Sequence, residues 1–174
     1  RTAAAGLVLF ALTAPLAAQD GPVPARPPNI VYILADDLGY GELGCYGQQR
    51  IRTPHLDRLA AQGMRFTQHY SGAPVCAPSR CVLMTGRHSG HATIRDNQEH
   101  KPEGQAPIAA ADVTIAEVLR EHGYRSGAFG KWGLGYPGSE GDPLQQGFDR
   151  FFGYNCQRQA HNFYPRYLWS DDQK

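Results

Sequence analysis

A cysteine and an arginine lie four residues apart in a segment that predicts the start of a helix. Pro78 suits a first helical turn, where its missing N–H costs nothing. Cys76 then lies at or just before the helix start, where unbonded N–H groups and the helix dipole favour an anion. Arg80 can point back over the same end, and Gly86 can follow the last turn. The segment therefore predicts an anion site that contains a cysteine-derived nucleophile.

The alternative for Cys76 is an inert, buried cysteine, since cysteine is among the most buried residue types. The run C-x-P-S-R-x-x-L-x-T-G-R, which starts at Cys76, fixes many positions together. It resembles the maturation and active-site motif of the type I sulfatases, in which the cysteine is oxidised after synthesis to a formylglycine aldehyde. The resemblance implies that Cys76 is the modified, catalytic residue and a metal contact, with Arg80 beside it.

Two adjacent carboxylates, Asp36 and Asp37, follow the apolar run 29–35, which is typical of a buried central strand in an α/β sheet. They repel each other unless a cation or hydrogen-bond donors compensate. Hard oxygen ligands suit Ca²⁺ or Mg²⁺, and a solvated turn capped by Asp is the alternative. The run N-I-V-x-I-x-A-D-D-L-G-Y-G resembles the opening strand of sulfatases, which implies that both aspartates bind Ca²⁺ in preference to Mg²⁺.

A lysine lies among glycines in the run 130–135, after a predicted strand at 124–129. Lys131 can reach an anion from there, although a solvated lysine is the common alternative. The run resembles the sulfatase segment G-K-W-H-L-G, which implies that Lys131 contacts sulfate. Gly133 replaces the common histidine of that segment, and His161 is the candidate for a donor in its place.

The elements expected to position these residues alternate along the chain. Strands are predicted over 29–35, 64–70 and 124–129. Thr53 is the expected N-cap of a helix that ends at Gly63. The predicted solvent-facing residues of that helix are His55 and Asp57.

Another helix is predicted over 114–122, opened by a capping box between Thr114 and Glu117. Its expected buried stripe consists of Ile115, Val118 and Leu119. Core positions are favoured for the aromatic residues near the end of the chain, with the lining of the cleft as the alternative; these residues are Phe163, Tyr164, Tyr167 and Trp169.

The chain has 174 residues, of which 41% are hydrophobic, so it can bury a core. Its net charge of +1 gives no argument for binding nucleic acid or an anionic membrane. The resemblance to sulfatases runs from about residue 29 to residue 154, with an extension to residue 169 left open. It implies an alkaline-phosphatase-like α/β sandwich, with a mixed, mostly parallel sheet between helices that is incomplete here.

Three regions are expected along the chain. Residues 1–18 form an apolar run typical of a signal peptide remnant, and residues 19–28 form a Pro-rich linker. Residues 29–174 are expected to form the N-terminal part of a sulfatase catalytic domain, truncated at its C-terminus. We therefore expect a periplasmic or secreted protein without a stable membrane anchor, and an isolated chain that is inactive.

The resemblance implies a sulfuric ester hydrolase that acts on carbohydrate or aryl sulfates. The hydrate of the formylglycine made from Cys76 would attack sulfur, and Ca²⁺, Arg80 and Lys131 would stabilise charge on the sulfuryl oxygens. A formylglycine-generating enzyme is the implied maturation partner. Two alternatives stay open: a phosphonate or phosphate monoester hydrolase of the same superfamily, and a non-catalytic secreted binding protein with unmodified Cys76.

Overall fold

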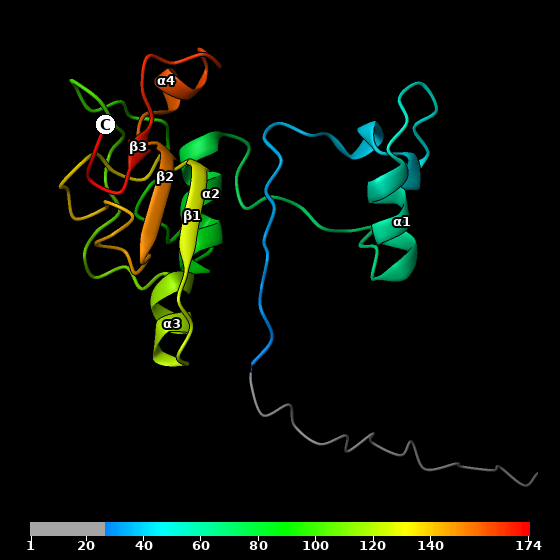
Figure 1. The fold of residues 1–174 in the computed structure, drawn as a ribbon, viewed down its shortest axis with the longest axis horizontal. Coiled ribbons are helices and arrows are strands. Elements are labelled where there is room, and N and C mark those ends of the chain that lie inside the picture. The colour runs from blue at the N-terminus through cyan, green and yellow to red at the C-terminus, as the bar shows by residue number, and fades with distance from the viewer. Residues whose placement is uncertain (1–26) are drawn as a thin grey trace, which may run out of the picture. The chain divides into compact units, whose positions relative to one another are not determined.

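The computed structural model describes residues 27–174, which divide into two compact units on either side of the Arg65–Phe66 bond (Figure 1). Each unit is described by itself. The predicted signal peptide remnant and most of the predicted linker lie outside the described residues. In residues 27–174, no helix has the length and apolar composition needed to span a bilayer.

The first unit is built around the helix α1 (Pro54–Gln62), which is preceded by the 3₁₀ turns η1 (Tyr40–Glu42) and η2 (Gly44–Tyr46). Thr53 is the N-cap and Gly63 the C-cap of α1, as predicted. Asp57 does not simply face solvent, because its Oδ1 accepts a hydrogen bond of 2.6 Å from the Cys45 N–H. The side chain of Asp57 therefore ties α1 to η2.

Two of the predicted strands are not formed. Residues 29–35 and 64–70 are irregular chain without ladder hydrogen bonds. The side chains of Val31 and Ile33 are 84% and 83% exposed, so the expected buried strand is wrong for this structure. The physical reason is that a central strand needs partners on both edges and cover on both faces, and an apolar pattern alone supplies neither.

The second unit contains a three-stranded sheet with the order β1-β2-β3. Strands β1 (Gly127–Lys131) and β2 (Arg150–Tyr154) are parallel, and Lys131 is paired with Tyr154. Strand β3 (Trp169–Ser170) is antiparallel to β2. The sheet is thus mixed, as predicted, and the strand predicted at 124–129 is formed at Gly127–Lys131.

Three helices accompany this sheet: α2 (Cys76–Thr85), α3 (Ile115–Glu121) and the single turn α4 (Gln157–Ala160). The capping box of α3 is confirmed by a 2.7 Å bond from the Thr114 N–H to Glu117 Oε2 and a 3.3 Å bond from the Glu117 N–H to Thr114 Oγ1.

The predicted buried stripe of α3 is wrong, because Ala116 is buried whereas Ile115 and Val118 are exposed. The physical cause is the buried Thr114 hydroxyl, which donates a 2.7 Å hydrogen bond to the Gln146 carbonyl. This bond fixes which side of the helix faces the rest of the unit.

The core of the second unit joins α2, α3 and the sheet. Phe151 of β2, Cys81 of α2 and Ala116 of α3 are almost completely buried in it. Further members are Ala77, Ala92, Ile94, Ile108, Trp132, Leu134, Phe148 and Trp169. Tyr167 packs against this core, but Phe163 and Tyr164 are exposed, so the core prediction holds for only two of the four aromatic residues near the chain end.

Candidate active site

Cys76 is the first residue of α2, as the sequence predicts. The preceding Val75 is extended (φ −126°, ψ 163°), and Gly86 ends the helix in the left-handed region at φ 65°. The Ala77 N–H, next to Cys76, donates a 2.9 Å hydrogen bond to the side-chain oxygen of Asn97. Asn97 thus fixes the start of the helix from twenty residues away. No local pattern points to it, because its role depends on the fold of the chain between the two residues.

Arg80 and Lys131 meet at the same end of the second unit. Arg80 Nη1 donates a hydrogen bond to the Lys131 carbonyl, and Lys131 is the last residue of β1. Figure 1 shows the start of α2 at the end of the sheet to which β1 and β2 point, with α4 also at this end. A half-buried cysteine, a guanidinium and an ammonium therefore lie on elements that converge, and this arrangement suits a small oxyanion.

Asp36 and Asp37 lie in the first unit and are exposed. Within the described part of the chain, no three His, Cys, Asp or Glu side chains are grouped so as to hold a metal ion. The two carboxylates fit a hard divalent cation by their chemistry, but Ca²⁺ takes six to eight oxygen ligands. These two residues can therefore supply only part of such a site.

Gly133 has no room for a side chain. Its φ is +78°, and a Cβ atom there would lie 2.6 Å from the side-chain Nε2 of Gln157. Gln157 is only 4% exposed, and its Nε2 has no hydrogen-bond partner among the described residues. His161 is exposed and follows α4, where its N–H bonds the Gln157 carbonyl at 3.1 Å. Gln157, which sequence reasoning missed, is the residue nearest to the position of that Cβ atom.

Arg87 lies at the far end of α2 and has a structural partner. Its Nη1 is 2.5 Å from Asp112 Oδ1, and Asp112 is buried. Asp112 Oδ2 also accepts hydrogen bonds from the Thr93 hydroxyl and the Ala109 N–H. This buried carboxylate therefore braces the end of α2 against two loops.

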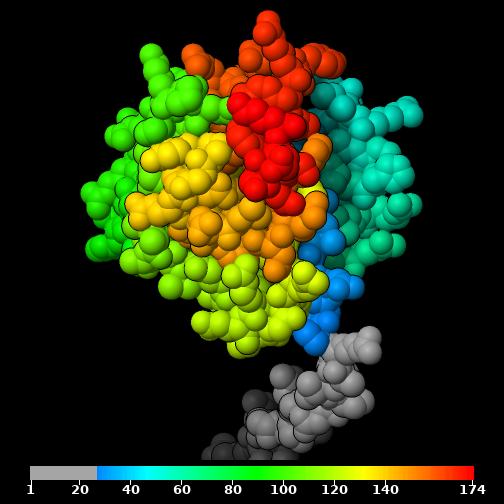
Figure 2. Space-filling view, turned by 60° about the vertical axis from the view of Figure 1, so that its left-hand side comes forward, coloured from blue at the N-terminus to red at the C-terminus, as the bar shows by residue number. Residues whose placement is uncertain are grey.

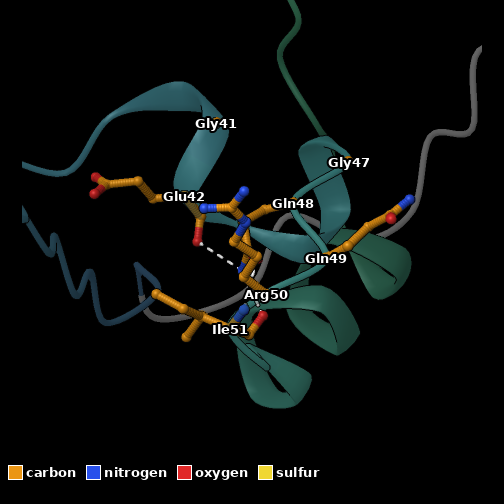
Figure 3. Close-up of a pocket in the computed structure, with 7 residues that line it drawn as sticks. All are labelled: Gly41, Glu42, Gly47, Gln48, Gln49, Arg50 and Ile51. Atoms are coloured by element: carbon orange, nitrogen blue, oxygen red, sulfur yellow. Dashed lines mark hydrogen bonds between the residues drawn. The ribbon is translucent and has the colours of Figure 1, made fainter.

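An open hollow lies in the first unit, at the turns that precede α1 (Figure 3). The Gln48 side chain reaches across it, where its Oε1 accepts a 2.6 Å bond from the Ile51 N–H. The lining residues are Gly41, Glu42, Gly47, Gln48, Gln49, Arg50 and Ile51. None of the predicted site residues is among them.

A parallel strand pair with cysteine, arginine and lysine near its carboxyl end defines an α/β domain with an anion-directed site. The family model "Sulfatase" matches residues 28–173, and the chain belongs to the sulfatase family. This match confirms the resemblance that the sequence motifs indicate.

Curated relatives include human arylsulfatase A, which is 48% identical over 151 residues that cover 84% of this chain and 28% of the relative. Mouse steryl-sulfatase is 42% identical over 160 residues, with 86% of this chain and 24% of the relative covered. The chain thus spans about a quarter of the length of these relatives.

Solved structures agree with this assignment. The crystal structure of Ps i-CgsB superposes with a TM-score of 0.73 at 29% identity and covers 86% of this chain and 37% of that protein. A sulfatase structure from a study of glycosaminoglycan metabolism by Bacteroides thetaiotaomicron has a TM-score of 0.71 at 34% identity, covering 84% of this chain and 31% of that protein. The neighbours have the alkaline-phosphatase-like fold, so the predicted fold class is confirmed.

Proposed function

We propose that the protein hydrolyses sulfate esters and that Cys76, matured to formylglycine, carries the nucleophile. Two observations support this most directly. Cys76 is the first residue of α2, and Arg80 donates a hydrogen bond to the carbonyl of Lys131 at the end of β1. Membership of the sulfatase family gives the reaction class. The aldehyde, once formed and hydrated, supplies a hydroxyl that can attack sulfur.

The residues of this site have separate roles in the proposal. The first N–H groups of α2 favour negative charge beside Cys76. Arg80 and Lys131 hold the sulfate group and offset the charge that develops on its oxygens in the transition state. Asp36 and Asp37 would hold Ca²⁺, which when bound supplies further stabilisation of that charge. Maturation requires a formylglycine-generating enzyme, and export agrees with the apolar run in residues 1–18.

The test is the mass of the tryptic peptide 66–80, from the complete gene expressed together with a formylglycine-generating enzyme. We expect an aldehyde in place of the Cys76 thiol, and turnover of an aryl sulfate. Cys76→Ala removes both. Cys81→Ala is the matched control, because Cys81 lies on the same helix but is fully buried in the core, so the Cys76 aldehyde still forms.

Two outcomes would contradict the proposal. An unmodified Cys76, in cells that convert a control sulfatase, would favour a binding protein. Faster turnover of a matched aryl phosphonate or phosphate ester than of the sulfate ester would instead favour the other hydrolase class of the superfamily.

A further inference from the structure

The helix α2, which begins at Cys76, has no side-chain cap from its own N-cap residue. That residue is Val75, whose apolar side chain cannot accept a hydrogen bond. Pro78 has no N–H, and the Ser79 N–H bonds the Val75 carbonyl at 3.1 Å. The N–H groups of Cys76 and Ala77 are therefore left without an acceptor inside the helix. The first turn of α2 needs a partner from elsewhere in the chain.

Asn97 supplies this missing cap. Its Oδ1 accepts the Ala77 N–H at 2.9 Å, as the side chain of an ordinary N-cap residue would do. The backbone of Asn97 is itself held, since its N–H bonds Asp96 Oδ1 at 2.7 Å. Because Ala77 directly follows Cys76, the bond from Asn97 fixes the backbone that carries the side chain of residue 76.

A hairpin formed by residues 98–106 follows Asn97 and gives it a defined place. The Ala106 N–H bonds the Gln98 carbonyl at 2.8 Å across the base of this hairpin. An antiparallel bridge joins the two strands next to this bond. Asn97 is therefore not an isolated surface side chain, because its position depends on the hairpin that it precedes.

The other strand of the hairpin is bonded to the run that follows Lys131. The Gln105 N–H bonds the Gly135 carbonyl at 2.9 Å, and just beyond the hairpin the Ile108 N–H bonds the Leu134 carbonyl at 3.0 Å. In Figure 2 the green part of the chain, which includes the hairpin, adjoins the gold part that follows this run. Hydrogen bonds thus connect the hairpin to the start of α2 on one strand and to the lysine run on the other.

We propose that Asn97 is a positioning residue for the reaction and that it holds the nucleophile at position 76 at a fixed spacing from Lys131. The inference rests on the proposed sulfatase function. In-line attack on sulfur depends on the placement of the attacking oxygen, and a displacement of about 1 Å can cost about a hundredfold in rate. The bonds through Asn97 and its hairpin keep this placement, whereas an uncapped first turn of α2 would fray.

The test uses the full-length protein, expressed together with a formylglycine-generating enzyme, with rates given per mole of aldehyde. Asn97→Ala should lower kcat on an aryl sulfate about tenfold and leave KM within about twofold, because the groups that hold sulfate remain while the nucleophile is displaced. Asn97→Asp keeps an oxygen that accepts the Ala77 N–H, so it should recover most of kcat. The charge that it adds acts on KM, and salt reduces this effect.

Two control variants separate positioning from a general loss of stability. Gln98→Ala should change nothing, because Gln98 is the neighbouring amide and its exposed side chain makes no hydrogen bond to another described residue. Thr114→Ala removes the cap of α3, which carries no predicted site residue, and should lower the thermal midpoint without lowering kcat. If Asn97→Ala likewise lowers only the midpoint, or if Asn97→Asp loses as much kcat as Asn97→Ala, the inference is overturned.

Amide hydrogen exchange separates this inference from the proposed function, because it needs no turnover. Asn97→Ala should raise the exchange rate of the Ala77 amide about tenfold and leave α3 unchanged. An aldehyde and turnover in the wild type, with the same kcat and the same exchange in Asn97→Ala, support the proposed function and overturn the inference. A wild type without aldehyde or turnover overturns the proposed function, and the catalytic role of Asn97 fails with it even if the exchange rate at Ala77 changes.

Discussion

At Gly133, one side-chain atom of Gln157 determines whether the candidate site has room for a side chain. Because Gln157 Nε2 fills the space where a Cβ would lie, a side chain at position 133 and the present position of Gln157 exclude each other. The replacement of the family's histidine by glycine therefore comes together with a buried glutamine from α4. The sequence motif shows the glycine, but it cannot show which distant residue fills the space.

Gly133→Ala should destabilise the protein by roughly 1–3 kcal/mol, because the methyl group meets Gln157 and the left-handed backbone is strained. Thermal or denaturant unfolding measures the loss. Gly138→Ala is the matched control, since Gly138 has nearly the same φ (+77°) but nothing within 4 Å of the added Cβ. Equal losses in the two variants would mean that Gln157 does not crowd position 133.

The pKa of Tyr167 is raised above its ordinary value of 10.0, chiefly because its hydroxyl hydrogen-bonds the Glu103 carboxylate at 2.5 Å. A raised pKa means that this group adds stability below the ordinary pKa, and that the contribution is lost as the pH rises through the raised value. We expect Tyr167→Phe to be less stable at neutral pH, with a loss that shrinks at high pH. Unfolding measured across this pH range checks the expectation, and a loss that does not change with pH would contradict it.

At the scale of elements, prediction from sequence works where the signals are local. The ends of α1, α2 and α3 follow from caps, prolines and glycines within a few residues, and all three helices are formed. The buried face of α3 could not be predicted from its apolar stripe, because a hydrogen bond from Thr114 to Gln146 sets its orientation. The same limit applies to Asn97, whose bond to the Ala77 N–H joins two distant segments.

Thr114 is expected to contribute more to the free energy of unfolding than an ordinary N-cap residue does. Its hydroxyl accepts from the Glu117 N–H and donates to the buried Gln146 carbonyl. Thr114→Ala should cost roughly 2–4 kcal/mol, the sum of a lost cap and an unsatisfied carbonyl. Denaturant unfolding measures this cost, and Thr114→Ser, which keeps the hydroxyl, should recover most of it. A loss below about 1 kcal/mol would show that the buried bond contributes little.

At the scale of the whole molecule, the two compact units divide the predicted site residues. Cys76, Arg80 and Lys131 belong to the second unit, whereas Asp36 and Asp37 belong to the first. The run 29–35 has the composition of a central strand but no strand partners among the described residues. A strand forms only where a neighbouring strand pairs with it. Composition alone therefore could not predict whether residues 29–35 form a strand in this structure.

Removal of Ca²⁺ tests the role of the aspartate pair in the full-length protein. A chelator should abolish turnover and lower the thermal midpoint, because a bound ion stabilises the folded state and offsets the repulsion between Asp36 and Asp37. Asp37→Asn should lower the midpoint in Ca²⁺ and reduce its response to the chelator.

Asp57→Asn is the matched control for this measurement. Its carboxylate accepts the Cys45 N–H, so the change should lower the midpoint equally with and without Ca²⁺. Asp37→Asn and Asp57→Asn each remove one negative charge. A midpoint that responds less to Ca²⁺ in Asp37→Asn than in Asp57→Asn therefore identifies Asp37 as a Ca²⁺ ligand. Equal responses of the two variants, or a wild type indifferent to the chelator in both midpoint and turnover, would remove Asp36 and Asp37 from the proposed site.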